Sequence, residues 1–113
     1  MIEGFDDDTC ELSSYEKTLV PIIVSKIKGN IGEEMAVKNK DIIRRLNSMG
    51  YEKITAARIR KIIHYIRVSK KVTNLIATSK GYYRAKSKSE IEKFVLSLQQ
   101  RINSIQSVRD SFL

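Results

Sequence analysis

Hydrophobic side chains recur at helical spacing in four stretches of the chain, and the clearest of these covers residues 55–67. Ile59, Ile62, Ile63 and Ile66 fall at positions i, i+3, i+4 and i+7, which places them on one face of a helix. Thr55 precedes the stripe, and a threonine hydroxyl at this position can accept from the free amides of a first turn. The spacing predicts a helix over 55–67 with one face turned to a core.

Three further stripes predict helices over about 18–28, 40–49 and 87–108. The start of the first helix is ambiguous. Ser13 and Glu16 match a capping box, whereas Pro21 is tolerated in a first turn and disfavoured deeper in a helix. We therefore favour a start near residue 18, with a preceding turn at 13–17. Asn39 is the expected cap of the second helix, and glycines are expected to end the first two helices.

Strand signals lie between and after these helices. Residues 35–37 are expected to form a very short strand, and residues 72–78 are rich in strand formers. A turn at 79–81 and a second strand at 82–85 complete a β-hairpin, in which at least one tyrosine of the pair 82–83 should face the core. The predicted fold is mainly α with a small β-hairpin (α+β), in the order helix, short strand, helix, helix, strand, wing, strand, long C-terminal helix.

Charge is distributed unevenly along the 113 residues, which carry a net charge of +8. Residues 1–16 hold six acids and no Lys or Arg, so the rest of the chain sets 21 basic residues against seven acids, a net charge of +14. A folded part this basic favours a polyanionic partner, most often nucleic acid, over a merely well-solvated surface. We expect an acidic flexible tail at 1–12, one domain at 13–86, and a C-terminal helical segment at 87–113.

The face of the 55–67 helix opposite the isoleucines carries Ala57, Lys61 and His64. Arg58 and Tyr65 flank this face on one side, while two further arginines at positions 60 and 67 flank it on the other. One face is thus suited to a core and the other to a negatively charged partner, as in a DNA recognition helix.

The residue pattern resembles a family. Thr55, Ile59, Lys61, Ile63 and Ile66 match recognition-helix spacing, and residues 75–83, with a Gly-Tyr pair opening the second strand, are similar to a wing. Over about residues 18–106 the chain resembles winged-helix (winged helix-turn-helix) domains of small phage-type and bacterial proteins. The resemblance implies a protein that binds double-stranded DNA through a recognition helix (55–67) and a wing (78–82). Transcription regulation and phage or plasmid DNA replication are both roles that it implies. A cytoplasmic location is expected from the single cysteine, the lack of a membrane-spanning run and an acidic N-terminus unlike a secretory signal. The wing is short and has one cation at its tip, Lys80, which leaves little for extensive minor-groove contact.

Candidate DNA contacts follow from this geometry, because the N-terminal half of a recognition helix enters the major groove. The predicted major-groove residues are Thr55, Ala57, Arg58, Lys61 and His64. The predicted phosphate contacts, which supply affinity and salt dependence but no sequence information, are Lys40, Arg60, Arg67, Lys70, Lys71, Lys80 and Arg84.

The C-terminal segment has apolar residues in alternating steps of four and three from Ile91 to Ile105, and Phe112 continues the register. Alternating steps of this kind indicate a coiled-coil seam. The first half is expected to pack on the domain. The second half either extends alone or pairs two chains into a homodimer, with dimerisation residues Leu98, Ile102, Ile105 and Phe112.

Other chemistry is not expected. No nucleophile–base pair, phosphate-cradling glycine loop or paired catalytic carboxylate appears, so we predict no enzyme activity, no cofactor and no small-molecule ligand. Cys10 is the single cysteine and His64 the single histidine, which argues against a disulfide and a metal site. No apolar run reaches membrane-spanning length. Two alternatives to duplex binding stay open: a protein–protein interaction adaptor, and sequence-independent binding of single-stranded nucleic acid.

Overall fold

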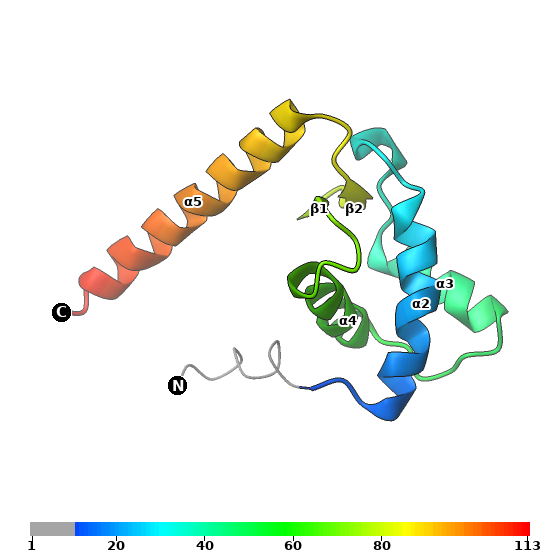
Figure 1. Ribbon diagram of the computed structural model, residues 1–113. Coiled ribbons are helices and arrows are strands. Elements are labelled where there is room, and N and C mark those ends of the chain that lie inside the picture. The colour runs from blue at the N-terminus through cyan, green and yellow to red at the C-terminus, as the bar shows by residue number, and fades with distance from the viewer. Residues whose placement is uncertain (1–10) are drawn as a thin grey trace.

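Helices and one two-stranded antiparallel hairpin build the described part of the chain, residues 11–113 of a computed structural model (Figure 1). The elements in chain order are α2 (Ser14–Lys28), the 3-10 turn η1 (Glu33–Met35), α3 (Asn39–Ser48), α4 (Ala56–Val68), β1 (Leu75–Thr78), β2 (Gly81–Arg84) and α5 (Lys88–Asp110). This order confirms a small, mainly helical α+β fold with a hairpin. Most of the expected acidic tail, including Cys10, lies outside the described residues. The tail does not extend to residue 12 as predicted, because Leu12 is buried in the core.

Helix α2 begins earlier than predicted. Ser13 is its N-cap, and the capping box with Glu16 is formed in both directions. The Ser13 Oγ accepts from the Glu16 amide at 3.1 Å, and the Ser13 amide donates to the Glu16 Oε1 at 2.9 Å. Pro21 therefore lies inside the helix, on its exposed side. The prediction gave too much weight to the hydrogen bond that proline cannot make and too little to the cap.

The N-terminal cap of α3 differs from the predicted one, whereas that of α4 agrees with the prediction. Asn39 is not the cap of α3 but its first residue. Lys38 is the cap, and its amide donates to the Asp41 carboxylate at 3.1 Å. Thr55 caps α4 as predicted, with its Oγ1 accepting from the Arg58 amide at 3.1 Å.

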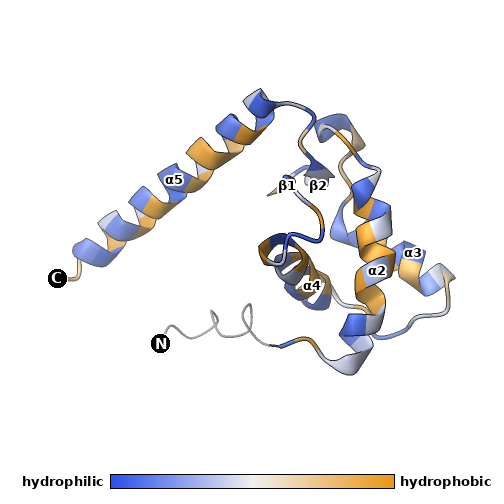
Figure 2. Cartoon of the chain, in the orientation of Figure 1, coloured by the Kyte–Doolittle hydropathy of each residue, from blue (hydrophilic) through white to orange (hydrophobic). Residues whose placement is uncertain are grey.

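The core lies between α2, α3, α4 and the hairpin. The four isoleucines of α4 that form the predicted stripe are all buried, as are Leu19, Ile23 and Ile27 of α2 and Ile42 and Leu46 of α3. In Figure 2 the apolar side of each of these helices is turned toward the others. Close packing of branched side chains from three helices fixes the orientation of α4 and therefore the direction in which its other side chains point.

The hairpin pairs Leu75 with Arg84 at one end and Thr78 with Gly81 at the other. The expected strand at 35–37 reduces to a single antiparallel bridge, in which Val37 exchanges backbone hydrogen bonds with Tyr82, while residues 33–35 form η1. Gly81 has φ +121°, and a Cβ there would collide with the backbone of Val37, so glycine is required for this approach. Both Tyr82 and Tyr83 are buried, which satisfies the expectation that at least one would be.

Helix α5 leaves the rest of the molecule as an arm (Figure 1). None of its side chains is buried, and only Ile91, Phe94, Leu98 and two polar residues near its start are half-buried. The prediction that its first half packs on the domain is correct only for this shallow contact. Over residues 11–113, no helix has both the length and the apolar character that crossing a membrane requires.

Candidate nucleic-acid interface

The side of α4 that faces α2 carries Arg58 and Lys61, and both bind Glu16. The Arg58 Nε donates to the Glu16 Oε2 at 3.0 Å, and the Lys61 Nζ donates to the Glu16 Oε1 at 2.8 Å. Arg58 also donates from Nη1 to the Lys53 carbonyl at 2.9 Å and lies over the Tyr15 ring. The two cations that the sequence favoured for the major groove are therefore occupied by a carboxylate of their own chain.

Glu16 is only 4% exposed and accepts from three donors. Burial by itself raises the pKa of a carboxyl group, but hydrogen bonds from Lys61, Ser13 and Arg58 outweigh it here. The pKa of Glu16 is lowered to about 2. The carboxylate is thus ionised at every physiological pH and ties the first turn of α2 to the first half of α4.

The outward side of α4 carries a different set of residues. Ala57 and Arg60 are exposed, and His64 is half-buried one turn further on. The small side chain of Ala57 lets a large partner approach the helix closely, and Arg60 lies three positions further along the helix. Arg60 forms no ion pair with any residue of the described range 11–113. Among the arginines of α4, it is the one whose charge is presented to solvent.

The hairpin side of α4 carries Arg67, which lies over the Phe94 ring of α5 at 5.6 Å. Burial lowers the pKa of Arg67, and nearby Arg101 of α5 lowers it further, whereas Tyr82 raises it. Burial also raises the pKa of Tyr82, whose hydroxyl donates to the Asn39 Oδ1 at 2.6 Å. The Arg67 side chain thus packs against α5, and only part of it reaches solvent.

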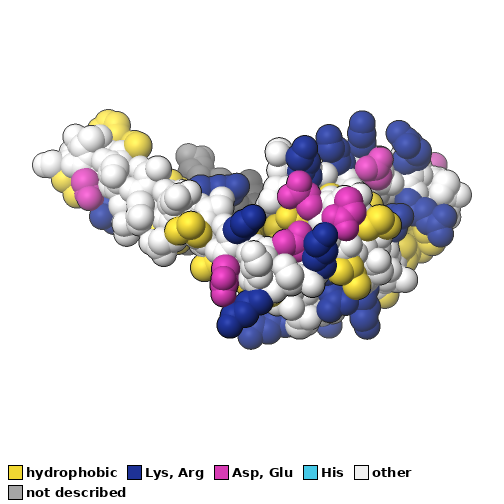
Figure 3. Space-filling view, turned by 90° about the horizontal axis from the view of Figure 1, so that it is seen from above, with side chains coloured by type: hydrophobic (Ala, Val, Ile, Leu, Met, Phe, Trp, Pro, Cys, Tyr) yellow, Lys and Arg dark blue, Asp and Glu magenta, His cyan; other side chains and the backbone are white. Residues whose placement is uncertain are grey.

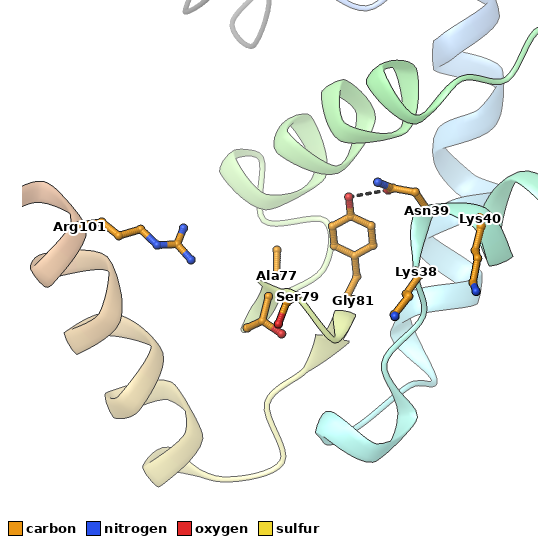
Figure 4. A pocket seen from close by; sticks show the side chains of 9 residues that line it. Lys38, Asn39, Lys40, Ala77, Ser79, Gly81 and Arg101 are labelled. Atoms are coloured by element: carbon orange, nitrogen blue, oxygen red, sulfur yellow. Dashed lines mark hydrogen bonds between the residues drawn. The ribbon is translucent and has the colours of Figure 1, made fainter. Parts of the chain in front are cut away.

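A hollow of about 440 Å³ lies beside this hairpin (Figure 4). Lys38 and Lys40 border it from the start of α3, and Arg101 reaches toward it from α5. Thr78 and Ser79 add hydroxyl groups from the hairpin, and no Asp or Glu is among its nine lining residues. Three cations and two hydroxyls around one opening suit a phosphate oxygen better than a neutral ligand.

Some of the remaining predicted DNA contacts are exposed lysines, and the others are already engaged in hydrogen bonds within the chain. Lys70, Lys71 and Lys80 are exposed, although Lys71 borders a hollow beside α2 with Tyr65, away from the hairpin. Arg84 instead donates to the carbonyls of Thr73 and Lys28, each at 3.4 Å, so it links the hairpin to the end of α2. The Thr55 hydroxyl is engaged as the cap of α4.

Sequence reasoning did not select three residues that the structure brings forward: Glu16, Lys38 and Arg101. Glu16 was noted only as half of a capping box, because nothing local indicates partners 42 and 45 positions away. Arg101 lies three residues after Leu98 and seven after Phe94. Helical spacing could therefore have predicted that Arg101 lies on the side of α5 that faces the domain. Lys38 directly precedes Asn39, the residue that was wrongly predicted to cap α3.

Lys and Arg side chains are spread over the compact part of the molecule in Figure 3, whereas exposed hydrophobic side chains recur along the α5 arm. Within residues 11–113, no group of three or more His, Cys, Asp or Glu side chains is placed to hold a metal ion.

No protein-family model, curated protein or solved structure matches the chain.

Proposed function

We propose that the chain is a winged-helix DNA-binding protein in which α4 is the recognition helix and β1–β2 are the wing. The protein occupies duplex DNA without chemistry, as a transcription regulator or a replication accessory factor. Support comes from the order of α2, α3, α4 and the hairpin, and from the single bridge between Val37 and Tyr82, which ties the segment before α3 to the edge of the hairpin.

The observation that carries the proposal is the outward side of α4. It exposes Ala57 and Arg60 next to half-buried His64, and the Lys38–Lys40–Arg101 hollow lies on the hairpin side of the same helix. Arg60 is the leading candidate for a base or phosphate contact, in place of Arg58 and Lys61, which hold Glu16. The hairpin turn has only Lys80 as a cation, so the wing contributes at most one charged phosphate contact.

The test is fluorescence anisotropy of a labelled random duplex and its matching single strand, across a salt series. Wild-type protein is expected to bind the duplex with affinity that falls steeply as salt rises, because phosphate neutralisation releases counterions. Arg60→Ala should weaken binding and lower the salt slope by about one. Arg45→Ala is the matched control, because Arg45 is an exposed arginine of α3 that borders α2 rather than the proposed interface.

Three results would contradict the proposal. Absence of duplex binding at low salt would favour a protein–protein adaptor. Tighter binding of the single strand than of the duplex would favour a single-stranded nucleic-acid binder. Equal losses from Arg60→Ala and Arg45→Ala would mean that binding is diffuse and does not use α4.

A further inference from the structure

The outer half of α5 has no partner among the described residues. Every residue from Gln99 to Leu113 is exposed, and these include Ile102, Ile105, Val108 and Phe112. Isolated helices gain little stability without tertiary packing of an apolar face. A continuous exposed apolar stripe of this kind marks an interaction surface.

The spacing of the stripe indicates what covers it. Val95, Leu98, Ile102 and Ile105 are separated by three, four and three residues, and the next steps reach Arg109 and Phe112. This is a heptad seam, whose side chains pack into the gaps of a second seam with the same repeat. The simplest surface with that repeat is α5 of another copy of this chain.

We propose that the chain self-associates through α5, with two copies of the helix packed antiparallel around Ile102 and Ile105. The seam is continuous with the half-buried residues Ile91, Phe94 and Leu98, so the pair extends from the edge of each domain outward. The proposal goes beyond DNA binding and concerns the assembly that carries the two domains.

The direction of pairing follows from Arg109. A parallel pair would place the two Arg109 side chains opposite each other within the seam, where like charges repel. In an antiparallel pair Ile102 faces Ile105 of the second copy and Leu98 faces its Arg109. The aliphatic stem of an arginine can cover a leucine while its guanidinium stays at the edge. Here that guanidinium already binds Asp110 at 2.9 Å.

The pairing sets the distance between the two domains. With the two-fold axis between residues 103 and 104, the two Ile91 positions lie roughly 37 Å apart along the helix pair, at 1.5 Å per residue. Half-sites on DNA one helical turn apart are separated by about 34–36 Å. This step rests on the proposed function: if the domain binds DNA, the pair separates the starts of the two α5 helices, and with them the domains, by a distance comparable to that between such half-sites.

Analytical ultracentrifugation of the full chain without DNA, from micromolar to sub-millimolar concentration, tests self-association. Wild type should sediment as a dimer at the upper end. Ile105→Asp, at a seam position that is 68% exposed, should shift the dissociation constant at least tenfold toward monomer. Leu96→Asp is the matched control, because Leu96 is 59% exposed on the opposite side of the same helix. It should leave the dimer unchanged.

Both positions are exposed, so neither change threatens the core, and far-UV circular dichroism should confirm folding. A monomeric wild type over the whole range overturns the proposal, as does a dimer that Ile105→Asp leaves intact. Since DNA is absent, either result leaves the proposed function standing.

Electron paramagnetic resonance tests the direction of pairing, with spin labels on Ser104→Cys or Ser111→Cys in a Cys10→Ser background. An antiparallel pair places the labels at position 104 close together and those at 111 roughly 20 Å farther apart along the axis. Short distances at both positions would indicate a parallel pair and overturn the assigned direction.

Discussion

The two sides of α4 carry similar charges that serve different purposes. On the side facing α2, Arg58 and Lys61 enclose the buried Glu16 carboxylate. On the outward side, both Arg60 and Ala57 are exposed. Arg58 and Arg60 are only two positions apart, yet a rotation of about 200° around the helix gives them different surroundings. The number of cations on a helix is therefore a poor guide to how many can meet a partner.

The difference has an energetic basis. A buried carboxylate stripped of its cations leaves an uncompensated charge, so the Glu16 cluster should matter greatly for stability. An exposed arginine contributes little to stability and remains available for binding. Substitutions at Glu16, Arg58 and Arg60 separate these two roles.

Glu16→Gln should lower the free energy of unfolding by about 3 kcal/mol at neutral pH, because it leaves Arg58 and Lys61 without their counter-charge. Urea denaturation measures the change. Glu52→Gln is the control: Glu52 is exposed and forms no ion pair within the described part of the chain, so its loss should cost less than about 0.5 kcal/mol. Similar midpoints for the two variants would show that the cluster is not a structural link.

Stability should also depend on acid through Glu16. Its pKa is about 2 in the folded chain and near 4.5 when unperturbed, so its contribution is full above pH 4.5 and is lost as the pH falls toward 2. The difference in unfolding free energy between wild type and Glu16→Gln should therefore shrink from about 3 kcal/mol at pH 7 to below about 1 kcal/mol near pH 2.5. Urea titrations at several pH values measure it, and a difference independent of pH would contradict the assigned ion cluster.

Arg58→Ala and Arg60→Ala should separate stability from binding. Arg58→Ala removes hydrogen bonds to Glu16 and to the Lys53 carbonyl and should cost about 2 kcal/mol of stability. Arg60→Ala should change stability by less than about 0.5 kcal/mol but weaken duplex binding. Paired denaturation and anisotropy measurements decide this, with binding compared where both variants are fully folded. A larger binding loss for Arg58→Ala than for Arg60→Ala would reverse the roles assigned to the two sides.

At the hairpin, a smaller loss of stability is expected than for the changes at Glu16 and Arg58. Tyr82→Phe removes the hydroxyl that donates to Asn39 and should cost about 1 kcal/mol. Tyr83→Phe is the control, since the Tyr83 hydroxyl forms no hydrogen bond with any residue in the described range. If the two changes have the same effect, the bond between α3 and the hairpin adds nothing to stability.

Local patterns were enough to predict much of this architecture. The isoleucine stripe of α4, the Thr55 cap and the turn at Ser79 and Lys80 each depend on residues within about one helical turn or one tight turn of each other. The start of α2 was harder, because two local signals, the Ser13 capping box and Pro21, conflicted. The structure favours the cap, whose Glu16 also gains two cations from α4.

The sequence by itself determined that α2, α3, α4, α5 and the hairpin form and which side of each helix is apolar, since these depend on spacing and on neighbouring backbone groups. Only the tertiary structure decided that Glu16 occupies Arg58 and Lys61, that Arg60 remains exposed, and that α5 projects from the domain with its seam uncovered. These outcomes depend on how helices dock. Docking is set by side-chain packing between residues tens of positions apart, and no local pattern records it.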